Sequence, residues 1–170
     1  HIGSRSVGFL RSVVETINIQ NPNLVVITGD FLDAKRVQAE DIAPLKNLKA
    51  PVYFSIGNHE RYAGLDWVIP LLEDAGVVML RSQTVKVGEL QLIGIDDAED
   101  KNQVRRELAK IELDPECFKI LLYHRPLGWE SAVASGINLM LSGHTHNGQI
   151  FPFNLLVRQQ FKRIRGRSEE

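Results

Sequence analysis

Apolar residues occur along this chain in two alternating patterns, one with helical spacing and one of short continuous runs. The first helical pattern is carried by Val7, Leu10, Val13, Val14 and Ile17. Apolar positions three and four residues apart line one face of a helix, so a helix is predicted here, and Asn21-Pro22-Asn23 ends it. The run at 24–28 is short, apolar and rich in β-branched residues, which predicts a buried strand.

This helix-then-strand order repeats along the chain. The further predicted helices and strands are 39–48 with 52–56, 65–75 with 77–80, 101–111 with 119–123, and 129–134 with 137–141. Two more runs, 84–87 and 90–95, are separated by Gly88-Glu89, which predicts a β-hairpin. Because helices and strands alternate without an internal repeat or a linker, the sequence predicts one α/β domain over residues 1–170.

Composition agrees with a single globular domain. The chain has 170 residues, 44% of them hydrophobic, and a net charge of −1, which excludes fibrous and disordered classes. A lone cysteine, Cys117, excludes an intramolecular disulfide. No apolar run approaches the roughly 20 residues that span a bilayer, and no charged-then-apolar leader opens the chain, so we expect a soluble segment. The abrupt start at His1 and the arginine-rich end lead us to expect a fragment truncated at both ends.

Polar side chains follow the predicted strands where each strand ends. They are Asp30, Asn58, His59, Asp96, Asp97, His124 and His144. In open α/β sheets the ligand site lies outside the carboxyl ends of the strands, so these distant loops are expected to converge. All five histidines are expected in such polar loops, and histidine is the commonest metal ligand. The distribution therefore predicts a metal-centred phosphate chemistry.

Taken one at a time, the acidic motifs allow two interpretations. Asp30 after Gly29 is either a carboxylate that bridges two cations or an Asx turn at a strand end, and neither is favoured. Asp33 either caps the following segment, which is the commoner role of such an aspartate, or holds an imidazole in one tautomer.

The histidine motifs are more specific. Residues two apart on an extended segment point to the same side, so His144 and His146 are predicted to face one site, which we favour over a polar turn. In 57–60, one tight turn is expected to offer the amide oxygen of Asn58 and an acid or base in His59. His124 taken alone is more often a satisfied histidine at a strand end, but the other motifs favour a ligand.

In this order the motifs resemble the signature of the calcineurin-like metallophosphoesterases: Asp-x-His, Gly-Asp-x-x-Asp, Gly-Asn-His-Asp/Glu, a later His and Gly-His-x-His. The chain carries His1 without the aspartate two residues earlier, then Gly29-Asp30-Phe31-Leu32-Asp33, Gly57-Asn58-His59-Glu60, His124 and Gly143-His144-Thr145-His146. The flanks of His124 and His146 resemble a bacterial branch with membrane-associated and exported members, which implies a soluble domain of a cytoplasmic or membrane-associated bacterial protein. The resemblance implies an α/β sandwich of two mixed sheets flanked by helices, here incomplete at the first strand and at the C-terminal strands.

The resemblance also implies which residues bind two metal ions. One ion would be bound by His1, Asp30 and His146 together with the missing aspartate, and the other by Asp30, Asn58, His124 and His144. His59 would lie over the substrate as a general acid or a positively charged stabiliser, and Asp33 would orient it.

Two divalent cations about 3.5–4 Å apart can activate a water and clamp the attacking and leaving oxygens of an in-line displacement at phosphorus. Imidazole and carboxylate ligands favour manganese, iron or zinc over calcium. We therefore expect a binuclear metallophosphoesterase, a phosphatase or a phosphodiesterase, that hydrolyses its ester by direct attack of metal-bound hydroxide. The alternatives are a non-catalytic metal-binding scaffold of the same fold and a nuclease. Because the near-neutral chain offers no long basic track for nucleic acid, a small or lipid-linked phosphoester is the expected substrate.

Other polar and aromatic residues are left outside the predicted site. Four of them either line a substrate pocket or, as is commoner, are ordinary surface and core: Arg125, Tyr62, Trp67 and Trp129. Asp96 and Asp97 either contact substrate or cap the next helix. The basic tail at 158–167 is expected to be a solvated face, with peripheral binding to anionic lipid or to a phosphate-rich substrate as the alternatives.

Overall fold

The computed structural model describes residues 2, 6–32, 37–146, 161 and 166. Its helices are α1 (Val7–Ile19), α2 (Ala39–Ile42), the 3₁₀ helix η1 (Ala43–Asn47), α3 (Asn58–Ala63), α4 (Leu65–Asp74), α5 (Gln103–Leu108) and α6 (Trp129–Ala134). Its strands are β1 (Val25–Ile27), β2 (Val52–Phe54), β3 (Val77–Met79), β4 (Gln83–Val87), β5 (Leu90–Ile95), β6 (Phe118–Tyr123) and β7 (Leu139–Leu141). Among these helices, none combines the length and the apolar character needed to cross a bilayer.

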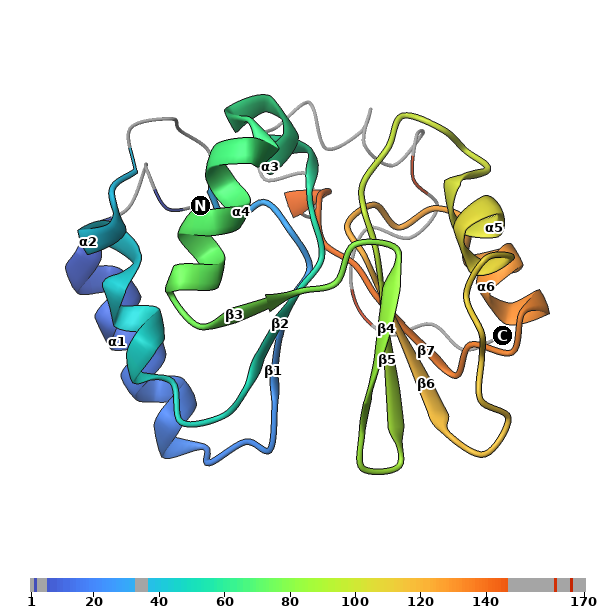
Figure 1. Ribbon diagram of the computed structural model, residues 1–170, viewed down its shortest axis with the longest axis horizontal. Coiled ribbons are helices and arrows are strands. Elements are labelled where there is room, and N and C mark those ends of the chain that lie inside the picture. The colour runs from blue at the N-terminus through green and yellow to red at the C-terminus, as the bar shows by residue number, and fades with distance from the viewer. Residues whose placement is uncertain (1, 3–5, 33–36, 147–160, 162–165, 167–170) are drawn as a thin grey trace.

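The strands of the described residues form two sheets that stand side by side in Figure 1. In the first sheet β1, β2 and β3 are parallel and lie in that order. In the second sheet the order is β4-β5-β6-β7, with β4 antiparallel to β5 and the remaining neighbours parallel. The α/β sandwich expected from the sequence is therefore confirmed, with one parallel sheet and one mixed sheet in the part of the chain described here.

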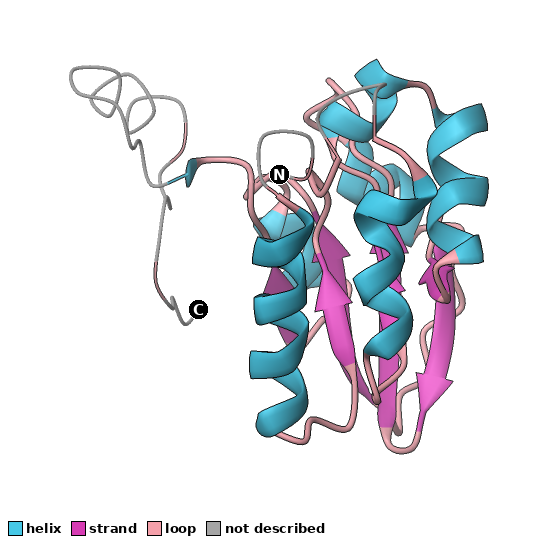
Figure 2. Cartoon of the chain, turned by 90° about the vertical axis from the view of Figure 1, so that its left-hand side faces the viewer, coloured by secondary structure: helices cyan, strands magenta, loops and turns pink. Residues whose placement is uncertain are grey.

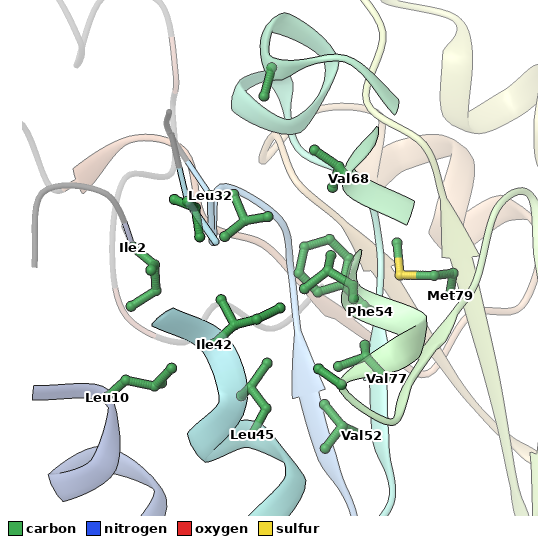
Figure 3. Packing of buried hydrophobic residues seen from close by; sticks show 14 of the residues in the cluster. Ile2, Leu10, Leu32, Ile42, Leu45, Val52, Phe54, Val68, Val77 and Met79 are labelled. Atoms are coloured by element: carbon green, nitrogen blue, oxygen red, sulfur yellow. The ribbon is translucent and has the colours of Figure 1, made fainter. Parts of the chain in front are cut away.

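Alternating side chains fill three apolar layers, because successive residues of a strand point to opposite faces. In β2, Val52 and Phe54 pack under α1, η1 and α4, whereas Tyr53 packs between the sheets with Leu92 of β5 and Leu122 of β6. The outward residues Ile93 and Tyr123 pack under α5 and α6. In Figure 2 the helices that cover the first sheet stand in front of the strands. Figure 3 shows the buried apolar side chains between these helices and the first sheet.

Two helices differ from the predicted pattern. The helix expected at 39–48 is split into α2 and η1, because Pro44 has no N–H to continue the α-helical hydrogen bonds. The tight turn expected at 57–60 instead begins α3, with Gly57 as its N-cap residue. His59 therefore lies on a helix, and the expectation that every histidine occupies a loop is wrong.

The carboxyl ends of the parallel strands lie at the upper edge of the view in Figure 1, where α3 also stands. A backbone hydrogen bond connects the segments that follow the two sheets near this edge, from the Asp97 N–H after β5 to the Ile56 carbonyl after β2, at 3.0 Å. The predicted convergence of polar loops follows from this arrangement.

Candidate metal centre

Among the described residues, Asp30, His124 and His144 form a cluster in which one ligand atom of each lies within 4.8 Å of the others. Asp30 follows β1, His124 follows β6 and His144 follows β7, so the cluster draws on both sheets. His124 Nε2 is 2.9 Å from Asp30 Oδ2 and 3.1 Å from His144 Nδ1. A carboxylate and two imidazoles thus converge on one point, as a divalent cation requires.

The protonation of this cluster follows from one hydrogen bond. His124 Nδ1 is 2.7 Å from the Thr28 carbonyl oxygen, which can only accept, so Nδ1 carries a hydrogen and Nε2 faces the cluster. Burial opposes charge on His124, but its hydrogen bond and attraction to Asp30 outweigh burial and raise its pKa. Burial and the charges of His124 and Arg125 lower the pKa of His144 to about 4.

The Asp30 side chain accepts hydrogen bonds that favour its charged form. Its own burial favours the neutral form, but hydrogen bonds from His124 and from the His59 backbone N–H lower its pKa below the ordinary value. The His59 N–H donates to Asp30 Oδ1 at 2.9 Å. His124 Nε2 and Asp30 Oδ2 are 2.9 Å apart, so a cation bound at this point would compete with protons for the same two atoms.

Glu60 fixes the backbone around this cluster. Its carboxylate is 0% exposed and accepts three backbone N–H groups, from Asp30 at 2.8 Å, Gly57 at 2.9 Å and Leu32 at 2.9 Å. Burial raises the pKa of Glu60 despite these bonds. Asp30 needs such support because its φ of 55° lies in the left-handed region, which is costly for a residue with a side chain. This role of Glu60 was not predicted from the sequence, where it is only the last residue of the motif at 57–60.

Gly57 is required by close contact rather than by its backbone angles, since its φ is −97°. A Cβ at this position would lie 2.4 Å from Asp30 Oδ1 and 2.9 Å from Glu60 Oε2. The turn before α3 therefore packs directly against the Asp30 loop. Asn58, between Gly57 and His59, begins the helix at this contact.

Asn58 supplies a direct test of whether the residues present fit a metal. Its side chain is 7% exposed, and its buried Oδ1 has no hydrogen-bond partner among the described residues. An unpaired buried amide oxygen costs about 1–3 kcal/mol unless a donor or a cation satisfies it. An unpaired amide oxygen at the start of α3, in a segment that packs against the Asp30 loop, fits a cation together with the carboxylate and the two imidazoles.

His59 lies at the edge of the cluster. Its Nε2 is 3.9 Å from Asp30 Oδ2, and its side chain is 37% exposed. The ring of Tyr62 lies beside it, with 6.2 Å between the ring centroids. His59 therefore reaches solvent, whereas His124 is almost completely buried.

The loop after β7 differs from its predicted geometry. The φ angles of His144 and His146 are 68° and 48°, so the segment is not extended and the rule that alternate residues face the same side does not apply. His146 is exposed, and the three-residue cluster does not include it. Buried Phe161 packs edge-on against the His144 ring, with centroids 5.5 Å apart, a contact that nothing in the sequence indicated. His1 and Asp33 lie outside the described residues.

Arg125 was predicted to be ordinary surface, but the structure buries most of its side chain in an ion pair. Its guanidinium donates to both oxygens of Asp97, from Nε at 2.7 Å and from Nη2 at 3.2 Å. Neither Asp96 nor Asp97 caps α5, because Asn102 is the N-cap residue. Asp97 is instead buried and forms ion pairs with Arg125 and, more loosely, with Arg61.

Comparisons with known proteins agree with this geometry. Residues 6–148 match the family model described as calcineurin-like phosphoesterase. Uncharacterized metallophosphoesterases of Campylobacter jejuni and Helicobacter pylori strain J99 are each 34% identical, over 94% and 93% of this chain. A Bos taurus transmembrane protein with a metallophosphoesterase domain is 34% identical over 84% of the chain and 37% of its own length. The chain spans 45% of the length of each of the two bacterial relatives.

Proposed function

This chain belongs to the calcineurin-like phosphoesterase family, and on that premise we propose that it hydrolyses a phosphomonoester or phosphodiester at a centre of two divalent cations. The observation that carries the proposal is the convergence of Asp30, His124 and His144 within 4.8 Å, together with the unpaired buried amide oxygen of Asn58, whose neighbour His59 donates its backbone N–H to Asp30. A structural cluster would gain nothing from leaving that oxygen unpaired.

The proposed ligands of one cation are Asp30, Asn58, His124 and His144. Asp30, His146 and His1 are proposed for the other, by analogy with the family motifs. This mixture of imidazole, carboxylate and amide suits manganese, iron or zinc. When bound, such a pair of cations lowers the pKa of a coordinated water and stabilises charge on the phosphoryl oxygens.

The protein's own groups divide the remaining tasks. The hydrogen bond from His124 Nδ1 to the Thr28 carbonyl directs the Nε2 lone pair of the neutral ring into the site. His59 holds Asp30 through its backbone N–H and leaves its ring exposed, which suits a general acid that protonates the leaving-group oxygen. Asp33 is proposed to orient the His59 ring.

We propose a small or lipid-linked phosphoester as the substrate. The net charge of −1 argues against a surface that follows a nucleic-acid backbone. A non-catalytic scaffold of the same fold would bind metal but cleave no ester, so turnover distinguishes it from the hydrolase.

Two substitutions separate the role of a ligand from that of an acid. His144→Ala is expected to lower both metal content and turnover, because it removes one converging nitrogen. His59→Ala keeps the backbone N–H on Asp30, so it is expected to retain metal and to lower turnover by about 10²–10⁴-fold. Metal content is measured by elemental analysis, and turnover with 4-nitrophenyl phosphate and bis(4-nitrophenyl) phosphate. Loss of metal from His59→Ala would contradict the assignment.

A further inference from the structure

Two arginines meet one buried carboxylate beside the proposed metal centre. Asp97 follows β5, and its side chain is 0% exposed. The Arg125 fork donates to both Asp97 oxygens and forms a complete ion pair. Asp97 is therefore already neutralised by a single arginine.

Arg61 is the second arginine, and its contact with Asp97 is looser. Its Nη1 donates to the Asp97 backbone carbonyl at 3.0 Å and lies 3.8 Å from Asp97 Oδ2. Its side chain is 42% exposed. A partly exposed pair at such a distance adds little stability, so what Arg61 adds at this position is positive charge.

Arg61 has no acidic side chain to itself among the described residues. The Arg125 fork occupies both oxygens of Asp97, and Glu99 also attracts Arg125. The neighbouring Asp96 attracts Arg61 too, but it is paired with Arg81, whose Nε is 3.0 Å from Asp96 Oδ2. The half-exposed guanidinium of Arg61 is therefore fixed through one donor, on the Asp97 carbonyl, and remains accessible from solvent.

This guanidinium is positioned by the same elements that carry the proposed ligands. Arg61 lies three residues after Asn58 on α3, and residues three apart share one face of a helix. Arg125 follows His124 directly, and Asp97 is bonded through its N–H to Ile56, two residues before Asn58. Arg61 therefore stands at the rim of the site on the side of Asn58.

We propose that Arg61 binds a second phosphoryl group of the substrate, beyond the one that is hydrolysed, and thereby determines specificity. Arginine suits this role because its planar fork matches phosphate oxygens with paired hydrogen bonds. The inference rests on the proposed function and narrows its substrate class to phosphoesters that carry a second phosphate.

Two matched chromogenic esters test this proposal: thymidine 5′-(4-nitrophenyl phosphate) and its 3′-phosphorylated counterpart. The wild-type protein is expected to have a lower KM for the ester with two phosphates. Arg61→Gln is expected to reduce this preference by about tenfold, the effect of losing one charged hydrogen bond, and Arg61→Lys to restore part of it. Arg81→Gln, an equally exposed arginine paired with Asp96, is the control and keeps the wild-type preference.

A binding measurement separates failure of this inference from failure of the proposed function. Thymidine 3′,5′-bisphosphate and thymidine 5′-monophosphate are titrated calorimetrically into the manganese-loaded protein. A preference for the bisphosphate that Arg61→Gln abolishes supports the inference even if neither ester is cleaved. No preference in the wild-type protein, or an equal preference in Arg61→Gln, overturns it whatever the turnover.

Discussion

Replacing Glu60 tests how the ligand loops are held in place. Its carboxylate accepts the N–H groups of Asp30, Leu32 and Gly57 in a completely buried position. Glu60→Ala leaves three buried donors unpaired, each worth about 1–3 kcal/mol. Because the substitution also removes the cost of burying a charge, the free energy of unfolding should fall by about 3–6 kcal/mol, less than the three donors together could cost.

Glu60→Gln should cost less. An amide oxygen in the place of Oε2 keeps the bonds to Asp30 and Gly57, and only the Leu32 N–H then faces the NH₂ group. One unpaired donor costs about 1–3 kcal/mol, partly offset because no charge is buried. Metal affinity should follow the same order and be lower in Glu60→Ala than in Glu60→Gln, since only Glu60→Ala loses the hydrogen bond that the Asp30 N–H donates to position 60.

The assay is urea unfolding of the metal-free protein, followed by manganese titration of each variant. Glu15→Gln on the exposed face of α1 is the control and is expected to change stability by less than about 0.5 kcal/mol. A Glu60→Ala variant within about 1 kcal/mol of the wild type would refute the reasoning, because unpaired buried donors cost more. A Glu60→Gln variant as damaged as Glu60→Ala would refute it too. If Glu60→Ala does not fold, the Glu60→Gln measurement still decides.

Three further predictions follow from the site. The raised pKa of His124 contributes stability to the metal-free protein that is fully present below pH 6.5 and is lost as the pH rises through the folded pKa. The lowered pKa of His144, about 4, has the opposite sign, but its cost is confined to pH values near and below 6.5, where the unfolded imidazole binds a proton. Unfolding free energies measured in chelator should therefore fall as the pH rises above about 7. Gly57→Ala should lose metal, because its Cβ would meet Asp30 Oδ1 at 2.4 Å, while Gly8→Ala on α1 should bind metal normally. His146→Ala should lower bound manganese from about two ions to about one per chain, and unchanged stoichiometry would exclude it as a ligand of the second cation.

Much of the fold could be predicted from sequence because its strands are short apolar runs separated by helical patterns. The hairpin at Gly88-Glu89 and the helix at 129–134 were predicted correctly for this reason. Helix α3 was missed, because Gly57-Asn58 is typical of a turn and the six-residue helix that follows is too short to show a period. Its existence depends on Glu60, whose carboxylate accepts the Gly57 N–H at the start of α3.

The site could be predicted only as far as residue type carries the chemistry. Asp30, His124 and His144 were predicted as ligands, and the structure brings them together. The roles of Glu60 and Asp97 could not be predicted, since each depends on contacts with residues about 30 positions away and on burial that an acidic residue rarely has. The geometry at His146 was missed because the left-handed backbone angles of this loop depend on its tertiary contacts rather than on its local sequence.

The cluster at the carboxyl ends of the strands joins two halves of the domain that otherwise meet mainly through apolar contacts. Asp30 follows a strand of the first sheet, and His124 and His144 follow strands of the second. A cation gripped by all three would act as a cross-link across the sandwich, so that neither half could unfold alone without first releasing the ion. Loading the protein should therefore slow amide hydrogen exchange in β1 and β6 together, and merge any separate melting of the two halves into one cooperative transition.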